Sequence, residues 1–221
     1  MDISAELSEI SSYGGFFAVT VGGGAAGWHP VTRSYANGYA DLIDATVARY
    51  RTSERRVGAS LVQLGHAARL WSPVLACAVA HGVIPDLTRL QRADDGARLR
   101  LPEPVGDPVD RDSSLPAALY RVVVREHMEP LAAGLRVKVA PDLLAGNIAS
   151  ALVGTAQALA AARPELREPI IAVTASLLNT GALAGTMTGS GLGFLRRSCC
   201  LFYRLPGSSL CGDCALHRTP R

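Results

Sequence analysis

The most constraining feature of this 221-residue chain is the distribution of its cysteines. Four of the five lie within sixteen residues near the C-terminus, as Cys199-Cys200, ten residues, Cys211, two residues and Cys214. The fifth, Cys77, lies in an apolar stretch and is expected to be an inert core residue. The chain does not open with a basic start followed by an apolar run, so we expect a cytoplasmic, reducing compartment. In such a compartment, clustered cysteines are more often metal ligands or redox groups than disulfides.

Composition predicts a folded chain whose positive charge is concentrated at one end. Apolar residues make up 48% of the chain and charged residues 19%, which excludes a disordered chain. The net charge of +3 is too small to indicate a nucleic-acid-binding protein. From residue 193 to the end there is one acid, Asp213, against five arginines: Arg196, Arg197, Arg204, Arg218 and Arg221.

Hydrophobic periodicity predicts a mainly α fold with a small β-hairpin. We expect a helical body over residues 1–184, followed by a glycine-rich, flexible connector and the cysteine-bearing segment over residues 185–221. The first thirty-five residues are expected to be loop with one short strand. The Asp95-Gly96 pair predicts the hairpin within residues 86–101. Helices are expected over residues 38–51, 57–82 with a break or kink at Pro73, 114–135, 142–162 and 164–183.

Two uncharged stretches, residues 143–162 and 169–195, are long enough to span a membrane. The first is mostly alanine, and the second is rich in threonine and glycine. Insertion depends on leucine, isoleucine, phenylalanine and valine, which are sparse or thin out in these stretches. We therefore expect them to form buried parts of a folded domain.

The four clustered cysteines suit two kinds of metal site. Four thiolates complete either one tetrahedral zinc ion or a [2Fe–2S] cluster, in which each iron takes two protein ligands. The Pro206-Gly207 pair in the spacer predicts a turn that brings Cys211 back to the adjacent pair. Zinc sites usually use two separated pairs, so adjacent cysteines favour the two-iron cluster. Zinc and disulfide bonding remain alternatives at this point.

The segment RRSCCLFYRLPGSSLCGDCAL, residues 196–216, resembles the C-terminal motif of the FhuF-type ferric-siderophore reductases. The family motif is two adjacent cysteines, ten residues, a cysteine, two residues and a cysteine, and every spacing is met here. Three further segments resemble the body of that family less distinctively: residues 68–87, 124–132 and 146–152.

The resemblance implies that Cys199, Cys200, Cys211 and Cys214 hold a [2Fe–2S] cluster, with no catalytic residue beyond it. It implies an oxidoreductase that passes one electron to the ferric ion of a siderophore. Because the sequence shows no flavin or nicotinamide fingerprint, we expect a separate electron donor, either a ferredoxin-like protein or a flavin reductase. Ferrous iron binds hard oxygen ligands more weakly than ferric iron, so reduction loosens the chelate. We expect no nucleic-acid partner, and we leave open a peripheral association with the inner face of the cytoplasmic membrane. Two alternatives are a zinc-binding, non-enzymatic interaction protein and an iron–sulfur redox sensor.

Charged residues near the motif allow two interpretations. Arg196, Arg197 and Arg204 either raise the potential of an anionic cluster and attract an anionic chelate, or form a solvated basic tail. Among the histidines, His66 and His81 are expected to be structural, and His217 is not needed as a ligand. His127 either lines a substrate groove or forms a surface ion pair. The early glycine run lacks the Gly-Lys-Ser/Thr ending of a phosphate-binding loop.

Overall fold

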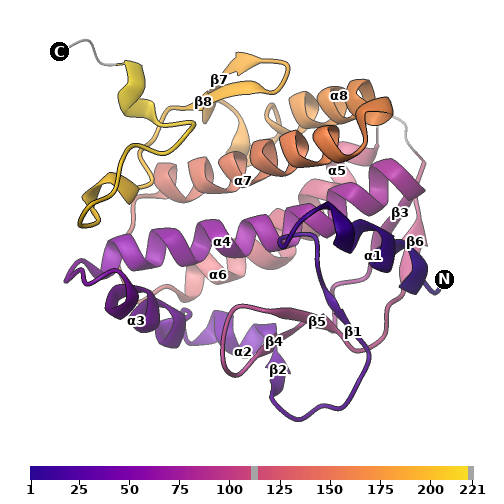
Figure 1. The fold of residues 1–221 in the computed structure, drawn as a ribbon, viewed down its shortest axis with the longest axis horizontal. Helices are drawn as coiled ribbons and strands as arrows, with labels where there is room; N and C mark the ends of the chain where they lie inside the picture. The colour runs from indigo at the N-terminus through magenta and orange to yellow at the C-terminus, as the bar shows by residue number, and fades with distance from the viewer. Residues whose placement is uncertain (111–113, 219–221) are drawn as a thin grey trace.

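Two long helices form the centre of the molecule (Figure 1). The computed structural model describes residues 1–110 and 114–218. In it, α4 (Arg55–Ala76) packs along α7 (Pro141–Ala162). The indole N–H of Trp71 donates to the Ile148 carbonyl at 3.2 Å, and the hydroxyls of Ser72 and Thr155 are 3.1 Å apart. The small side chains of α7 let the two backbones approach closely enough for these bonds.

Of the break or kink expected at Pro73, the break is wrong. Pro73 lies inside α4, and its carbonyl still accepts the backbone N–H of Cys77. The helix continues as a π-helical segment, Cys77–His81, and ends at Gly82 in the left-handed conformation with φ 67°. Proline removes one backbone donor, but the surrounding turns are fully buried, so packing holds the helix together across it.

Shorter helices surround this pair. The expected helix after Ser114 is present as α5 (Leu115–Tyr120), a π-helical segment (Arg121–Met128) and α6 (Glu129–Gly134), with Val124, Met128 and Leu131 buried on one face. Two further helices are α3 (Ala40–Arg49) and α8 (Arg167–Leu177), and there are 3₁₀ turns at Ser11–Tyr13, Pro164–Leu166, Gly181–Leu183, Phe202–Arg204 and Ala215–Arg218. The last expected helix therefore ends about six residues early.

The first thirty-five residues contain more structure than expected. They form α1 (Ser4–Ile10) and α2 (Val31–Ala36) as well as two strands. Ile3, Leu7 and Ile10 repeat at intervals of four and three, and all three are buried. The segment is too short and too rich in serine and glutamate for this periodicity to stand out in the sequence.

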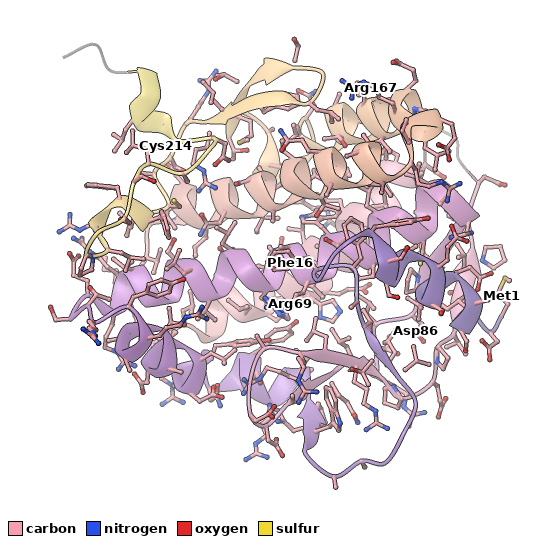
Figure 2. The ribbon with its side chains drawn as sticks, in the orientation of Figure 1. Met1, Phe16, Arg69, Asp86, Arg167 and Cys214 are labelled. Carbon is pink, nitrogen blue, oxygen red and sulfur yellow. The ribbon has the colours of Figure 1, made fainter. Side chains whose placement is uncertain are left out.

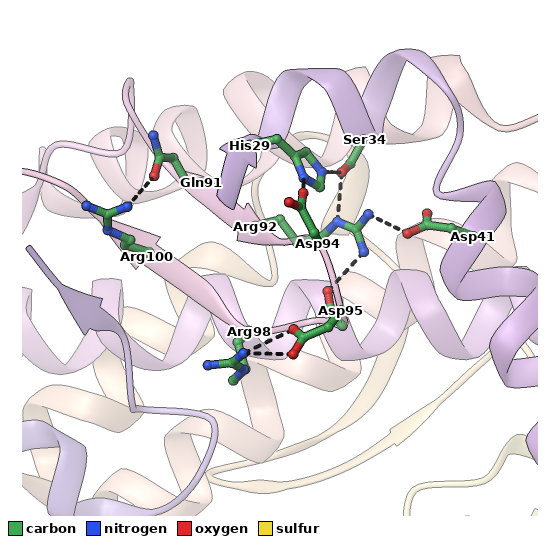
Figure 3. A network of polar contacts seen from close by, with 10 residues as sticks. His29, Ser34, Asp41, Gln91, Arg92, Asp94, Asp95, Arg98 and Arg100 are labelled. Atoms are coloured by element: carbon green, nitrogen blue, oxygen red, sulfur yellow. Dashed lines mark hydrogen bonds and ion pairs between the residues drawn. The ribbon is translucent and has the colours of Figure 1, made fainter. Parts of the chain in front are cut away.

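The predicted hairpin is confirmed as β4 (Gln91–Ala93) and β5 (Leu99–Leu101), in which Arg92 pairs with Leu99. It lies in a four-stranded sheet of order β1-β5-β4-β2, with β1 at Thr20–Val21 and β2 at Trp28–Pro30. Buried Arg92 ties β4 to the neighbouring helices, because it donates to the Ser34 hydroxyl at 2.8 Å and to the Asp41 carboxylate at 2.5 Å (Figure 3). A second sheet pairs β3 (Val83–Pro85) with β6 (Gly106–Pro108).

The glycine-rich stretch expected to be a flexible connector is an ordered hairpin. β7 (Met187–Ser190) pairs antiparallel with β8 (Gly193–Arg196). A side chain on Gly189 would lie 2.3 Å from the Gly193 carbonyl oxygen, so this glycine lets the two strands approach. The fold class is confirmed as mainly helical with small sheets, and the cysteine segment begins directly at the end of β8.

By length and composition, α7 is the one helix in the described part of the chain that is able to cross a membrane. Two thirds of its most apolar window, 67%, is buried against the rest of the protein. This agrees with its place beside α4 as a core helix.

Candidate iron–sulfur site

The cysteine segment lies against the first halves of α4 and α7, where Figure 1 shows it in yellow. Ser60 of α4 donates its hydroxyl proton to the carbonyl oxygen of Cys200 at 2.7 Å. The side chain of Asn147, on α7, donates to both the carbonyl and the hydroxyl oxygen of Ser60, each at 3.0 Å. All three residues are buried, so these bonds fix the backbone of the cysteine pair to both central helices.

Arg196 extends this network to the second cysteine pair. Its guanidinium donates to the Asn147 side-chain oxygen at 2.9 Å and to the Asp213 carboxylate at 3.2 Å. The Arg196 backbone N–H also donates to the Asp213 carbonyl at 3.0 Å. Since Asp213 lies between Cys211 and Cys214, one arginine holds both ends of the motif in place. Only 2% of Arg196 is exposed, so the solvated-tail interpretation is wrong for this residue.

The other two arginines of the segment remain at the surface. Arg197 and Arg204 are both exposed, and the Arg204 guanidinium lies 2.7 Å from Glu54 at the start of α4. That ion pair lowers the pKa of the Glu54 carboxyl. The three arginines grouped together in the sequence therefore have three different environments.

Gly146 leaves room on α7 for the hydroxyl group of Ser198. A side chain at this position would begin 2.1 Å from the hydroxyl oxygen of Ser198, the residue before the cysteine pair. Gly146 thus leaves space for Ser198, and its neighbour Asn147 forms the hydrogen bonds with Ser60 and Arg196.

Two of the four thiol groups lie close together. The sulfurs of Cys200 and Cys211 are 3.5 Å apart. Two thiolates on one tetrahedral ion with metal–sulfur bonds of about 2.3 Å are separated by roughly 3.8 Å, so this spacing suits two ligands of one metal ion. In the described part of the chain, no three Cys, His, Asp or Glu side chains gather around one point.

The other two sulfurs accept backbone hydrogen bonds of the kind that tune iron–sulfur clusters. The N–H of Leu201 lies 3.3 Å from the Cys199 sulfur, and the N–H of Leu216 lies 3.4 Å from the Cys214 sulfur. Leu201 reaches this position in the left-handed conformation, with φ 67°. Such bonds stabilise charge on the thiolates and raise the potential of a cluster.

Two of the four thiols have perturbed pKa values. Burial raises the pKa of the Cys199 thiol, and burial followed by contact with Cys200 raises the pKa of the Cys211 thiol. Cys200 and Cys214 are buried, whereas Cys199 and Cys211 are partly exposed. The site therefore has an inner pair of sulfurs and an outer pair that reaches the surface.

Comparison with known families identifies this segment. Residues 196–216 match the model of the FhuF 2Fe-2S C-terminal domain. The segment is thus similar to an FhuF-type [2Fe–2S] domain, and we call it the FhuF-type domain. Its cofactor is a [2Fe–2S] cluster, as the motif predicts, and the zinc alternative loses its support. No curated protein and no solved structure matches the chain. The match covers the FhuF-type motif and not the three body segments, so their resemblance stays a prediction.

The remaining candidates lie away from the FhuF-type domain. Cys77 is buried in the core, where burial raises the pKa of its thiol to about 12. His66 is a buried, hydrogen-bonded residue, as expected. The surface ion pair expected for His127 is wrong, because its Nδ1 lies 2.8 Å from the buried Tyr35 hydroxyl. His81 lies 3.7 Å from the Glu9 carboxylate.

Hydrophobic periodicity missed the residues that position the cysteines. It selects Val57, Leu61, Leu64, Ala68 and Trp71 as the buried face of α4, but Leu61, Leu64 and Ala68 are only partly buried. The fully buried positions include Ser60 and Gln63, which a pattern of apolar residues ignores. One sequence feature could have indicated this contact surface: Gly146-Asn147 places a small residue and an amide side chain inside an alanine-rich helix.

Proposed function

We propose that this protein reduces a ferric siderophore by one electron, with Cys199, Cys200, Cys211 and Cys214 as the ligands of its [2Fe–2S] cluster. The observation that carries the proposal is the match to the FhuF-type domain over the segment that contains all four cysteines. When bound, the cluster supplies one electron, Fe(III) of the chelate gains it to become Fe(II), and a separate donor protein replaces it.

The protein's own residues hold the site and set its charge. Ser60, Asn147 and Arg196 fix the ligand backbone to α4 and α7, which limits rearrangement when the charge of the site changes. The positive charge of Arg196 favours the more negative, reduced state of the site. Its partner Asp213 offsets part of this effect.

The outer pair of thiols gives the site its access to partners. Cys199 and Cys211 are partly exposed, and the exposed residues around them include Arg197, Tyr203 and Leu210. A donor protein with an acidic surface is expected to dock here, because exposed arginine attracts it over a Debye length. We propose a cytoplasmic location, in which the donor is a ferredoxin-like protein or a flavin reductase.

The test is a turnover experiment under exclusion of oxygen. Protein reduced beforehand is mixed with a ferric chelate and a ferrous trap, and Fe(II) formation is compared with the rate given by dithionite alone. The C200S variant is expected to lose the activity, whereas C77A keeps it because Cys77 lies in the helical core. No Fe(II) above the dithionite rate, with the cluster intact, would contradict the reductase and favour a redox sensor.

A further inference from the structure

The turn between α3 and α4 brings a second group of positive charges to the cysteine segment. Residues 49–56, which we call the basic turn, contain one acid, Glu54, and four arginines: Arg49, Arg51, Arg55 and Arg56. All four arginines are exposed. The basic turn lies at the same end of the molecule as the cysteine segment, which is yellow in Figure 1.

Hydrogen bonds and packing hold the basic turn beside the cysteine segment. The Arg204 guanidinium donates to one oxygen of the Glu54 carboxylate at 2.7 Å, and Arg56 donates to the other at 2.9 Å. Further along α4, Ser60 holds the carbonyl of Cys200 at 2.7 Å. The 3₁₀ turn that carries Arg204 also packs on α4. The basic turn and the cysteine segment therefore lie side by side, although they are far apart in the sequence.

Carboxylates neutralise only part of this charge. Glu54 is shared by two arginines, and Arg55 pairs with Asp44 of α3. Arg49 and Arg51 form no ion pair with a carboxylate of the described residues. With the arginine that binds Glu54 from the cysteine segment included, five arginines face two acids, which leaves a net charge of +3. A surface of this charge attracts an acidic partner.

Arg51 has a backbone conformation that favours glycine, with φ 51°. Its N–H donates to the Ala48 carbonyl at 3.2 Å, and the N–H of Thr52 donates to the Val47 carbonyl at 3.2 Å. These two bonds end α3 in a left-handed turn, in which glycine is the usual residue because it has no side chain to clash. Backbone strain of this kind clusters at binding and active sites. At this position it presents a charged side chain to solvent.

Exposed apolar side chains lie next to this charge and next to an outer thiol. Tyr203 is 42% exposed and directly precedes Arg204 in the same 3₁₀ turn. Leu210 is 38% exposed and directly precedes Cys211. Transient electron-transfer interfaces are small, and protein interfaces in general have an apolar centre within a polar rim. This face has both parts, and it includes a sulfur of the candidate iron–sulfur site.

We propose that the basic turn and the exposed apolar side chains of the cysteine segment form the docking surface for an acidic one-electron donor protein. This proposal rests on the reductase function and assigns the body of the protein a part in recognising the donor. One electron passes from the donor to the site, and no covalent bond forms or breaks. An anionic membrane is attracted by the same charge, but it would cover Cys199 and Cys211, the two thiols that reach the surface. A protein donor therefore suits this face better.

Stopped-flow mixing tests this surface without any ferric chelate. Oxidised, oxygen-free holoprotein is mixed with a reduced acidic flavodoxin, whose flavin absorbance reports the loss of one electron. The bimolecular rate constant is expected to fall steeply with added salt, because charge steers the encounter. In R49Q/R51G it is expected to fall about tenfold at low salt, since electrostatic steering raises association rates by at least that factor.

Three further variants separate charge, strain and apolar contact. R51G removes a charge and relieves backbone strain, so its melting temperature is expected to hold or rise while electron uptake slows. L210S is expected to speed dissociation of the complex without changing the salt dependence, because only apolar contact is lost. R167Q is the matched control, because Arg167 is exposed at the start of α8, and Figure 2 shows it across the molecule from Cys214.

The outcomes distinguish the docking surface from the reductase function. Equal rate constants in R49Q/R51G and R167Q, or no dependence on salt, would overturn the docking surface even if protein reduced by dithionite reduces ferric chelates. Slower electron uptake in R49Q/R51G, together with no ferric reduction by the unmodified protein, would keep the docking surface and contradict the reductase. Vesicles of phosphatidylglycerol and phosphatidylcholine test the membrane. Vesicle binding that R49Q/R51G abolishes, with electron uptake unchanged in that variant, would overturn the donor surface in favour of a lipid surface.

Discussion

The hydroxyl of Ser60 lies 2.7 Å from the carbonyl oxygen of Cys200, although 140 positions separate the two residues in the chain. This bond joins the FhuF-type domain to the helix at the centre of the body. The cluster site therefore packs against the helical body and is not attached to it only through a flexible linker. The stability of the site is therefore expected to depend on residues of α4 and α7.

Removing the Ser60 hydroxyl should loosen the cluster. S60A leaves the Cys200 carbonyl without this donor, at a cost of about 1–3 kcal/mol for a buried polar group. We expect faster loss of visible absorbance when the protein is exposed to an iron chelator. S72A is the matched control, because Ser72 is also buried on α4 and contacts Thr155 on α7, away from the cysteines. Equal rates of cluster loss in both variants would show that Ser60 has no specific role.

Arg196 should raise the reduction potential of the cluster. R196Q removes a buried positive charge beside the ligands, so the midpoint potential is expected to fall by about 60 mV, equivalent to about 1.4 kcal/mol for one electron. The exposed neighbour offers the control, since R197Q changes the same formal charge in solvent. Redox titration followed by absorbance measures both. A larger shift in R197Q than in R196Q would contradict this assignment.

The two glycines of α7 should respond differently to the same substitution. A side chain on Gly146 meets the Ser198 hydroxyl, whereas one on Gly154 meets open space. We expect G146V to displace the cysteine segment and lower iron content, and G154V to retain full iron content with a folded body. Iron analysis and circular dichroism distinguish the two variants. Full iron content in G146V would mean that the segment does not need this close approach.

Acid should destabilise the body through its buried histidines. Burial lowers the pKa of His127 from an ordinary 6.5 to about 4, so the unfolded chain binds the proton first as the pH falls. The contribution of neutral His127 to the free energy of unfolding is complete above pH 6.5. It is lost as the pH falls toward 4, by up to about 3 kcal/mol. Urea unfolding from pH 8 to pH 5 measures the slope, which H127Q should flatten. An unchanged slope in H127Q would rule out this contribution.

Features of the fold and site that depend on neighbouring residues could be predicted from the sequence, whereas contacts between distant residues could not. The resemblance of the cysteine motif to the FhuF-type motif predicts the cofactor. Periodicity predicts α7, and the Asp95-Gly96 pair predicts the β4–β5 hairpin, because local patterns decide these elements. The contacts of Ser60, Asn147 and Arg196 join residues far apart in the chain, and no local pattern encodes such pairings. Pro73 does not break α4, because tertiary packing outweighs its local helix-breaking preference. The glycines at 185–193 form part of an ordered hairpin instead of a flexible connector.

The most direct test of the central claim is metal and sulfide analysis of protein purified without oxygen, combined with electron paramagnetic resonance. The account predicts about two irons and two acid-labile sulfides per chain, a visible absorbance that bleaches on reduction, and a one-electron signal that C200S abolishes. Protein that folds with zinc, or with neither iron nor sulfide, would contradict it.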